Sequence, residues 1–371
     1  MLGGIAAAVA IVLFVTAHEA GHFLAAKAVG MKATQFFFGF GPKIWSTQRG
    51  ETEYGFKWLP LGGYVRIVGM NPLEEVSPQD LGRTYREKKF WEKSFVVLAG
   101  VGTNFLIAFV LFLGIALTQG IAVPTTEVDD VVATVEIERA EQPSPAALAG
   151  LESGDVILGV GDSTVNSWDD VIAALRDEGG GPTTLVVDRD GEVLMLETDL
   201  IQQPASDGQG TTGFLGVTSV VVVEEVGVGQ GIGLAAQGVW KGIEGTFVSI
   251  GEMVRPSNVI QYFGVFVGDT DVDQNIRPVS PIGIVNITTQ MESVAAFVGI
   301  LALVNVILAT LNLLPLFPLD GGHFAVALYE KLTHREANIE KLMPVAAAVV
   351  ILFVFLGLVG IILDVVNPIS L

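Results

Sequence analysis

Four stretches of this chain are long enough and apolar enough to cross a lipid bilayer as α-helices. They cover about residues 3–27, 94–119, 294–316 and 344–366. A helix needs roughly 20 apolar residues to span the hydrocarbon core of a bilayer. Half of the 371 residues are hydrophobic, and the mean hydropathy is +0.57. The sequence therefore predicts an integral membrane protein whose polar segments connect four spans.

The distribution of basic residues indicates how these spans are oriented. Residues 27–93 contain eleven Lys and Arg, whereas the longer segment 121–290 contains six. Cytoplasmic loops carry an excess of Lys and Arg, so we expect 27–93 on the cytoplasmic side and 121–290 on the outer side. We also expect the amino end outside, because Met1 directly precedes the first span, and no basic segment supports a cleaved signal peptide. The net charge of −20 argues against nucleic acid as a partner.

The first span contains the motif His18-Glu19-Ala20-Gly21-His22 in its cytoplasmic half. On a helix, His18 and His22 project from one face, a spacing that suits two imidazole ligands of one Zn²⁺ with Glu19 as the general base. A chance His-x-x-x-His pair is common on soluble helices. Within a span, each ionisable side chain costs about 2.5–3.5 kcal/mol, so three together favour a metal site. The chain has no cysteine, which leaves His and carboxylate as zinc ligands.

A hydrolytic zinc site usually has three protein ligands and one open position. Asp320 follows the third span, and with four spans the parity places it on the same side of the membrane as the motif. An Asp-Gly turn at a helix end is the ordinary interpretation of that residue. His323 is a rival ligand and His334 a more distant one. Pro315 and Pro318 break the third span there and free backbone groups to face a cavity.

Residues 33–70 are rich in aromatic and β-branched residues around a polar turn at 48–53, which predicts a β-hairpin or sheet. Gly62 and Gly63 permit tight turns and close backbone approach. The hairpin is either a cytoplasmic lid or a membrane-dipping sheet whose edge receives an unwound substrate strand. Residues 86–93 then predict an interfacial helix with an aromatic anchor.

Residues 125–202 have a soluble composition, with alternating strand patterns and one helix predicted at 168–176. The stretch Ala149-Gly-Leu-x-x-Gly-Asp-x-Ile157 resembles a PDZ domain, a family that binds extended peptides or carboxyl termini by strand addition. A spacer that only blocks bulky substrates is the alternative. Residues 203–229 predict a linker with two strand-like runs, and 231–254 predict an amphipathic helix on the outer surface.

Taken together, these motifs resemble the site-2 protease family of intramembrane zinc metalloproteases, in its bacterial PDZ-containing branch. The matching segments, beyond the first motif and the PDZ-like region, are Gly39-Phe-Gly-Pro42, Pro60-Leu-Gly-Gly-Tyr64, Ala99-Gly100 with Asn104, Ser280-Pro-Ile-Gly-Ile284, and Asn312 with Pro315 and Leu319-Asp-Gly-Gly322. The resemblance implies that His18, His22 and Asp320 bind zinc and that Glu19 is the catalytic acid/base. It also implies that Asn312 helps to position substrate, beside Gly62, Gly63 and Pro315. Val101 departs from the proline that is usual after Ala-Gly.

The expected fold is a polytopic α-helical membrane protein with four transmembrane helices, a membrane-associated β-hairpin or sheet, and one inserted extracytoplasmic PDZ (α+β) domain. We expect the first span with the zinc motif at 1–29, the cytoplasmic-side hairpin and interfacial helix at 30–93, and the second span at 94–120. The PDZ domain is expected at 121–202, and the linker with the surface helix at 203–291. The third span with the third ligand is expected at 292–323, a cytoplasmic loop at 324–343, and the fourth span at 344–371.

The expected function is hydrolysis of peptide bonds within single-pass proteins of the cell membrane, in regulated proteolysis such as anti-sigma factor cleavage. The active site is then on the cytoplasmic side, and Zn²⁺, the lipid bilayer and a peptide or carboxyl terminus in the PDZ groove are the partners. The alternative is a non-hydrolytic PDZ-bearing adaptor with a structural zinc site. Such a site has a fourth protein ligand, for which His323 is a candidate, and it does not require Glu19 as a base. A metal transporter needs ion-pathway residues in other spans, and the fourth has only Asp364.

Overall fold

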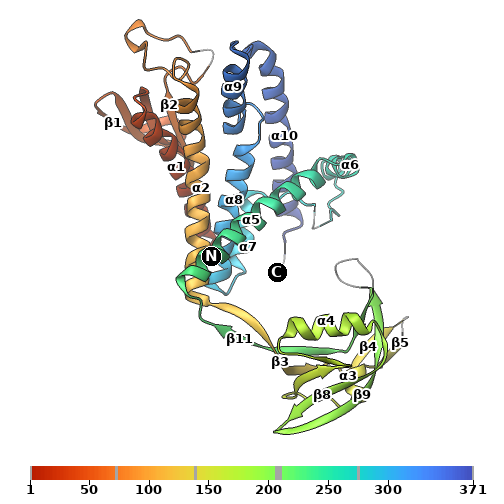
Figure 1. Ribbon diagram of the computed structural model, residues 1–371. Coiled ribbons are helices and arrows are strands. Elements are labelled where there is room, and N and C mark those ends of the chain that lie inside the picture. Colours follow the sequence, from red (N-terminus) through yellow and green to blue (C-terminus); the bar gives the residue numbers. More distant parts are fainter. Residues whose placement is uncertain (1, 72–73, 138–139, 205–210, 274–275, 370–371) are drawn as a thin grey trace. The chain divides into compact units, whose positions relative to one another are not determined.

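The computed structural model describes residues 2–71, 74–137, 140–204, 211–273 and 276–369. The chain folds into two units, one formed by Met1–Thr118 with Gly227–Leu371 and the other by Gln119–Val226. The helices of the first unit are α1 Leu2–Ala28, α2 Phe90–Gln119, α5 Val228–Met253, α6 Pro256–Val265, α7 Pro281–Thr289, α8 Val294–Leu313, α9 Asp320–Thr333 and α10 Ile339–Val366 (Figure 1).

Four of these helices, α1, α2, α8 and α10, are long and apolar enough to cross a membrane. This finding confirms the polytopic membrane fold predicted from the sequence. Several boundaries differ from the expectation, including the start of α10, which begins at Ile339 rather than 344 and keeps Pro344 inside the helix. The residues expected at the end of an interfacial helix, 90–93, form the first turn of α2, because no helix-breaking residue separates them from the span. The third helix, α8, ends at Leu313 instead of 316, since the chain turns extended at Leu314, before Pro315.

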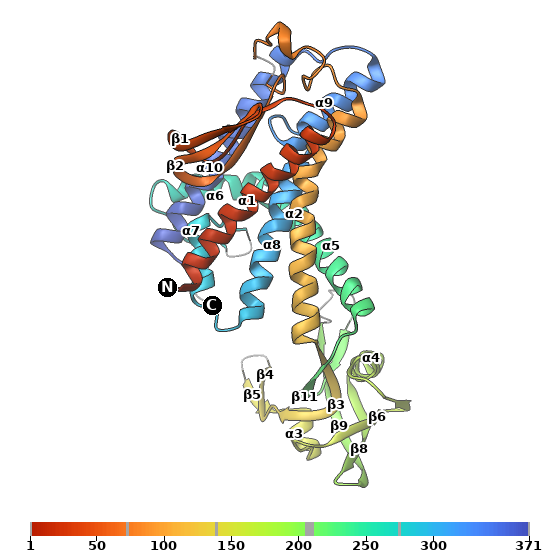
Figure 2. The same cartoon turned by 90° about the vertical axis from the view of Figure 1, so that its left-hand side faces the viewer.

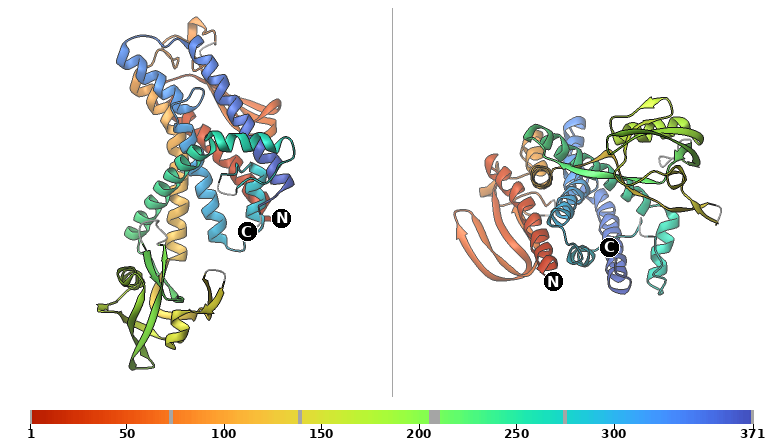
Figure 3. Two further views of the ribbon diagram at one scale, coloured as in Figure 1. Left: turned by 90° about the vertical axis from the view of Figure 1, so that its right-hand side faces the viewer. Right: turned by 90° about the horizontal axis from the view of Figure 1, so that it is seen from below.

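Strands β1 (Ala33–Arg49) and β2 (Thr52–Ile67) form an antiparallel ribbon that bends back on itself. Residues 35–38 of β1 each have two partners, one within 53–56 and one within 63–66 of β2. The first part of β1 therefore lies between two parts of β2, and the 63–67 segment pairs on one side only. Figure 2 shows this ribbon alongside α1, and Figure 3 (right) shows α1 between the ribbon and α8.

The turn of the ribbon is held against the last turn of α1. Glu51 accepts hydrogen bonds from Lys27 Nζ at 2.6 Å and from Arg83 Nη2 at 2.9 Å. The Thr52 hydroxyl donates to the Ala33 carbonyl at 2.7 Å. The Lys27–Glu51 contact ties the ribbon to the helix that bears the His-Glu motif, so it fixes the position of the ribbon turn relative to the carboxyl-terminal end of α1.

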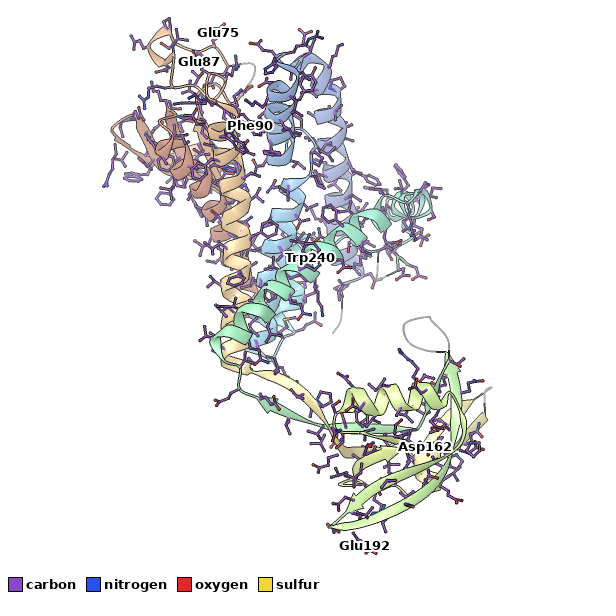
Figure 4. The ribbon with its side chains drawn as sticks, viewed as in Figure 1. Glu75, Glu87, Phe90, Asp162, Glu192 and Trp240 are labelled. Atoms are coloured by element: carbon purple, nitrogen blue, oxygen red, sulfur yellow. The ribbon has the colours of Figure 1, made fainter. Side chains whose placement is uncertain are left out.

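Helix α5 packs one face against two of the spans. A Cβ on Gly231 would lie 3.0 Å from Leu117 of α2, and one on Gly242 would lie 2.9 Å from Val306 of α8. Its other face carries the exposed Trp240, which Figure 4 labels. The helix is amphipathic, as the sequence predicted, but its small residues bring it directly against α2 and α8.

The second unit contains α3 (Pro145–Ala149), α4 (Trp168–Glu178) and a largely antiparallel sheet with the strand order β10-β9-β8-β6-β3-β11. The strands are β3 Ile121–Val131, β4 Thr134–Ile137, β5 Ala140–Pro143, β6 Val156–Val160, β7 Ser163–Thr164, β8 Gly181–Arg189, β9 Glu192–Pro204, β10 Thr211–Phe214 and β11 Val217–Glu224. Its core is formed by apolar side chains of the sheet and of α4, including Ile157, Leu185 and Val171.

The segment expected to be a linker, 203–229, contributes two strands to this sheet. β10 pairs with β9 from Thr211 to Phe214, and β11 pairs with β3 from Val217 to Glu224. Backbone hydrogen bonds to the rest of the sheet override the Gly- and Ser-rich composition that favoured a linker. The α+β unit is therefore longer than the sequence indicated.

Candidate metal centre

His18 and His22 stand one turn apart on α1, and both are buried. Their Nε2 atoms are 3.1 Å apart, and the rings meet edge to face with centroids 4.7 Å apart. Two imidazole nitrogens at this separation point at a shared position. The i, i+4 spacing of the sequence is thus realised as a pair of convergent donors.

Asp320, the first residue of α9, closes this pair into a triangle. Its Oδ2 lies 3.1 Å from His18 Nε2 and 3.2 Å from His22 Nε2. Among the residues that the structure describes, these three form the only group of three or more His, Cys, Asp or Glu side chains whose donor atoms gather within 4.8 Å. The sequence predicts Asp320 on the same side of the membrane as the His-Glu motif, and the fold brings Asp320 into contact with both histidines.

The donor set fits a zinc ion. Asp320 Oδ2 is buried and has no hydrogen-bond partner in the described structure. Zinc bonds to nitrogen and carboxylate oxygen measure about 2.0–2.2 Å, long enough to reach all three corners of the triangle from one point. Two imidazoles and one carboxylate are also the protein ligands of known hydrolytic zinc sites, which leave a fourth position open. A bound cation accounts for the carboxylate oxygen that is otherwise left unpaired.

Two glycines allow Asp320 to reach the site. The chain leaves α8 at Leu313 and turns sharply into α9. A Cβ on Gly321 would lie 2.2 Å from the Leu313 carbonyl oxygen, and a Cβ on Gly322 would lie 2.4 Å from the Phe317 nitrogen. Any side chain at either position would push α9 away from α8, and Asp320 would move with it.

The backbone of α2 orients one of the two imidazoles. His22 Nδ1 lies 2.8 Å from the carbonyl oxygen of Val96. A carbonyl only accepts, so this contact places the ring proton on Nδ1 and leaves the lone pair of Nε2 for a metal. His18 Nδ1 is buried without a hydrogen-bond partner in the described structure, so the tautomer of His18 is not set in this way.

Glu19 is held by the edge of β2. The Val65 N–H donates a hydrogen bond of 3.1 Å to Glu19 Oε2. Gly62 makes this approach to α1 possible, since a Cβ there would lie 2.8 Å from Val15 Cγ1, whereas a Cβ on Gly63 would lie 3.1 Å from the Phe37 carbonyl oxygen of β1 and is restricted by the ribbon itself. The edge of β2 that pairs on one side only therefore runs past the carboxylate.

The rival ligands lie outside the triangle. The His323 ring packs against Phe317, with centroids 4.9 Å apart, and against Tyr85, at 6.4 Å. Burial lowers the pKa of His323 below its ordinary value. Burial raises the pKa of Asp320, but the two adjacent imidazoles outweigh this effect and hold it below its usual range. His334 is exposed at the carboxyl end of α9.

Two cavities flank the edge of β2. The larger, of about 890 Å³, is lined by Tyr64 to Ile67 of β2, by Phe317 and His323, and by polar residues of the loop that follows β2. The smaller, of about 430 Å³, is almost entirely apolar and is lined by one face of α1 from Ala8 to Val15, by Phe38 and Pro60 of the ribbon, and by α7. One strand edge thus connects an apolar groove along α1 with a more polar cavity beside His323.

The remaining predicted residues lie at the end of α8. Asn312 is half-buried in the last turn of this helix, and Pro315 is exposed just beyond it. The contributions that sequence reasoning missed are backbone atoms, the Val65 N–H and the Val96 carbonyl. No side chain marks these positions, so only the pairing of β2 and the crossing of α2 over α1 could have indicated them.

Comparisons with known proteins find similar sequences along nearly the whole chain. A family model described as Peptidase family M50 matches residues 6–357. The zinc metalloprotease Rip1 of Mycobacterium bovis is 37% identical over 400 residues, which cover 98% of this chain and 97% of the relative. Rip1 of Mycolicibacterium smegmatis is 35% identical, with 100% and 98% covered. A putative zinc metalloprotease of Clostridium perfringens is 27% identical, with 95% of each chain covered.

Proposed function

Because the chain belongs to peptidase family M50 and is a zinc metalloprotease of the membrane, we propose that it hydrolyses peptide bonds within the transmembrane segments of single-pass proteins. The observation that carries this proposal is the position of the donor triangle. His18 and His22 lie in a helix long and apolar enough to cross a bilayer, and the edge of β2 adjoins Glu19 in the same helix.

His18, His22 and Asp320 are the residues that hold the metal. When bound, zinc supplies a Lewis acid that polarises the scissile carbonyl and acidifies a water molecule. Glu19 takes a proton from the attacking water on a carboxylate oxygen and later gives it to the leaving amine nitrogen. The Val65 N–H, bonded to Oε2, keeps the carboxylate in one orientation for both transfers.

A peptide bond inside a transmembrane helix is shielded by the hydrogen bonds of the helix, so the substrate must unwind before it is cut. The segment of β2 at 63–67 pairs on one side only and supports strand addition of the unwound segment. The apolar cavity along α1 suits the hydrophobic part of the substrate, and the cavity beside His323 suits its polar flank. Asn312 and Pro315, at the end of α8, contact the same segment in this proposal, beside Gly62 and Gly63.

The second unit is proposed to be an extracytoplasmic PDZ domain. Its composition, the Ala149–Ile157 stretch and the scarcity of basic residues over 121–290 support that assignment. Strand β11 is an edge strand of the sheet, with β3 as its neighbour on one side. Its other edge is available for an extended peptide or a carboxyl terminus. A spacer that excludes bulky substrates is the other possibility for this unit.

The basic segment 27–93 supports an active site toward the cytoplasmic side of the cell membrane. The resemblance to site-2 proteases supports substrates that have already been trimmed outside the membrane, as in regulated proteolysis of anti-sigma factors. A non-hydrolytic adaptor with structural zinc requires a fourth protein ligand. The cluster in the described part of the chain has three members, and His323 packs elsewhere.

The proposal is tested by reconstituting the full chain in liposomes with single-pass substrates of known sequence, either intact or truncated outside the membrane. Mass spectrometry of the products is expected to place the cut within the transmembrane segment, and a zinc chelator is expected to abolish it. Cutting only in the soluble flanks, or cutting that resists the chelator and zinc removal, would contradict the proposal.

A further inference from the structure

Helices α1 and α2 cross closely at the metal site because each contributes a glycine. A Cβ on Gly21 of α1 would lie 2.7 Å from the Ala99 carbonyl oxygen and 2.5 Å from Thr103 Oγ1. A Cβ on Gly100 of α2 would lie 2.3 Å from His22 Nε2 and 2.5 Å from His22 Cε1. Heavy atoms do not approach a Cβ this closely, so His22 occupies the space that any other residue at position 100 would fill.

The same turn of α2 also holds the ring by its other nitrogen. His22 Nδ1 lies 2.8 Å from the Val96 carbonyl oxygen, and Val96 precedes Gly100 by one helical turn. In an α-helix the carbonyl of residue i points toward the N–H of residue i+4. The imidazole therefore reaches the carbonyl by lying across the backbone at Gly100, where no side chain covers the helix.

We propose that Gly100 is a positioning residue of the zinc site, an inference that rests on the metal centre of the proposed function. The bare backbone at Gly100 admits the His22 ring, the Val96 carbonyl fixes the proton on Nδ1, and Nε2 is left facing His18 and Asp320. The residue contacts neither metal nor substrate in this account. It acts only through the orientation of His22.

Gly102 provides a matched control on the same helix. A Cβ at this position would meet nothing within 4 Å. Replacement of either glycine by alanine raises intrinsic helix propensity by about 1 kcal/mol, so the two variants share any effect on helix formation. They differ in the space available beside the residue, because only Gly100→Ala places a methyl group against the His22 ring.

The first test measures zinc affinity of the full chain in detergent by competition with a chelator. Gly100→Ala is expected to bind zinc roughly 10–100-fold more weakly than wild type, the loss typical of a disrupted outer-shell contact, while Gly102→Ala keeps the wild-type affinity. With Co²⁺ in place of zinc, the visible absorption of Gly100→Ala is expected to change, since the geometry of the His22 nitrogen changes. Equal affinities and equal spectra for the two variants would overturn the proposal.

A second test separates this role from general packing. In a His22→Ala background there is no ring to displace, so adding Gly100→Ala is expected to change the thermal stability of the metal-free chain only as much as adding Gly102→Ala does. A drop in stability as large as in the wild-type background would show that the glycine serves helix packing alone and would overturn the proposal. The readouts do not require cleavage, so a chain that binds zinc but cuts nothing would contradict the proposed protease function and not this inference.

Discussion

Two aspartates of the first unit lie near helix ends, Asp364 buried and Asp320 partly buried, and their surroundings differ completely. Asp364, near the end of α10, accepts hydrogen bonds from Arg277 Nη2 at 2.8 Å and from the Ser280 N–H at 2.7 Å. Asp320, at the start of α9, points Oδ2 at two imidazole nitrogens, and this oxygen has no hydrogen-bond partner in the described structure.

The difference supports the separate roles that we propose for the two carboxylates. A buried charge is tolerated when it is paired and hydrogen-bonded, which is the condition of Asp364. Asp320 faces groups that themselves have lone pairs to share, so only a cation or a proton can satisfy the three atoms together. In one membrane domain, the partners of a buried carboxylate thus distinguish a structural ion pair from a metal ligand. The same contrast removes the basis for a transporter, since Asp364 is already neutralised by Arg277.

Replacing Asp320 by asparagine is expected to have the largest effect. The change removes a ligand and a charge, so zinc affinity should fall by more than the roughly 10–100-fold that loss of an outer-shell partner costs. Asp364→Asn is the matched variant and should retain wild-type affinity. Zinc titration of both purified variants checks the comparison, and equal losses would remove the distinction between the two aspartates.

The Asp364→Asn variant is expected to show the reverse pattern in stability. It leaves Arg277 buried without its counter-charge, which typically costs about 3–5 kcal/mol. Asp320→Asn leaves the Arg277–Asp364 pair intact, so the metal-free chain should lose less stability than it does with Asp364→Asn. Reversible unfolding in mixed detergent micelles measures both. Unfolding of Asp364→Asn at the same denaturant concentration as wild type would contradict the structural role of the Asp364–Arg277 pair.

A third carboxylate, Glu51, lies between these extremes because it is paired but partly exposed. Hydrogen bonds from Arg83 and Lys27 lower the pKa of Glu51 to about 2. Its folded pKa lies below its unfolded value, so its contribution is complete above pH 5 and is lost as the pH falls toward about 2. Glu51→Gln should cost about 1 kcal/mol at neutral pH and flatten this part of the pH profile. Unfolding of wild type and Glu51→Gln measured from pH 6 to pH 3 checks this prediction. An unaltered pH profile in the variant would contradict the stabilising role of the hydrogen bonds to Glu51.

The parts of this account that sequence predicted are those carried by side-chain type and spacing. The convergence of His18 and His22 follows from helical geometry. The parity of four apolar spans placed Asp320 only on the same side of the membrane as these histidines, and its role as third ligand came from the resemblance to site-2 proteases. The polar turn near Glu51 and the ribbon around it follow from composition. Each of these signals is local, or depends only on how often the chain crosses the membrane.

The parts that sequence did not predict depend on backbone atoms and on distant pairing. The Val65 N–H reaches Glu19 because of the way β2 folds back, and the Val96 carbonyl reaches His22 because α2 crosses α1. No residue type in the sequence indicates either contact. The two strand-like runs of 203–229 were predicted from the sequence, but their pairing as β10 with β9 and β11 with β3 was not. Gly100 belongs to a segment that matches the family, but only the structure shows that the His22 ring lies against Gly100 and that Gly102 has open space beside it.

The most direct test of the central claim pairs zinc content with cleavage in wild type and Glu19→Gln. The account predicts that both proteins bind about one zinc, since Glu19 is not a ligand, and that the variant cuts a single-pass substrate roughly 10²–10⁴-fold more slowly because it lacks the general base. Equal cleavage by the two proteins, or a wild-type protein that binds no zinc, would contradict the assignment of this triangle and its neighbouring glutamate as the active site.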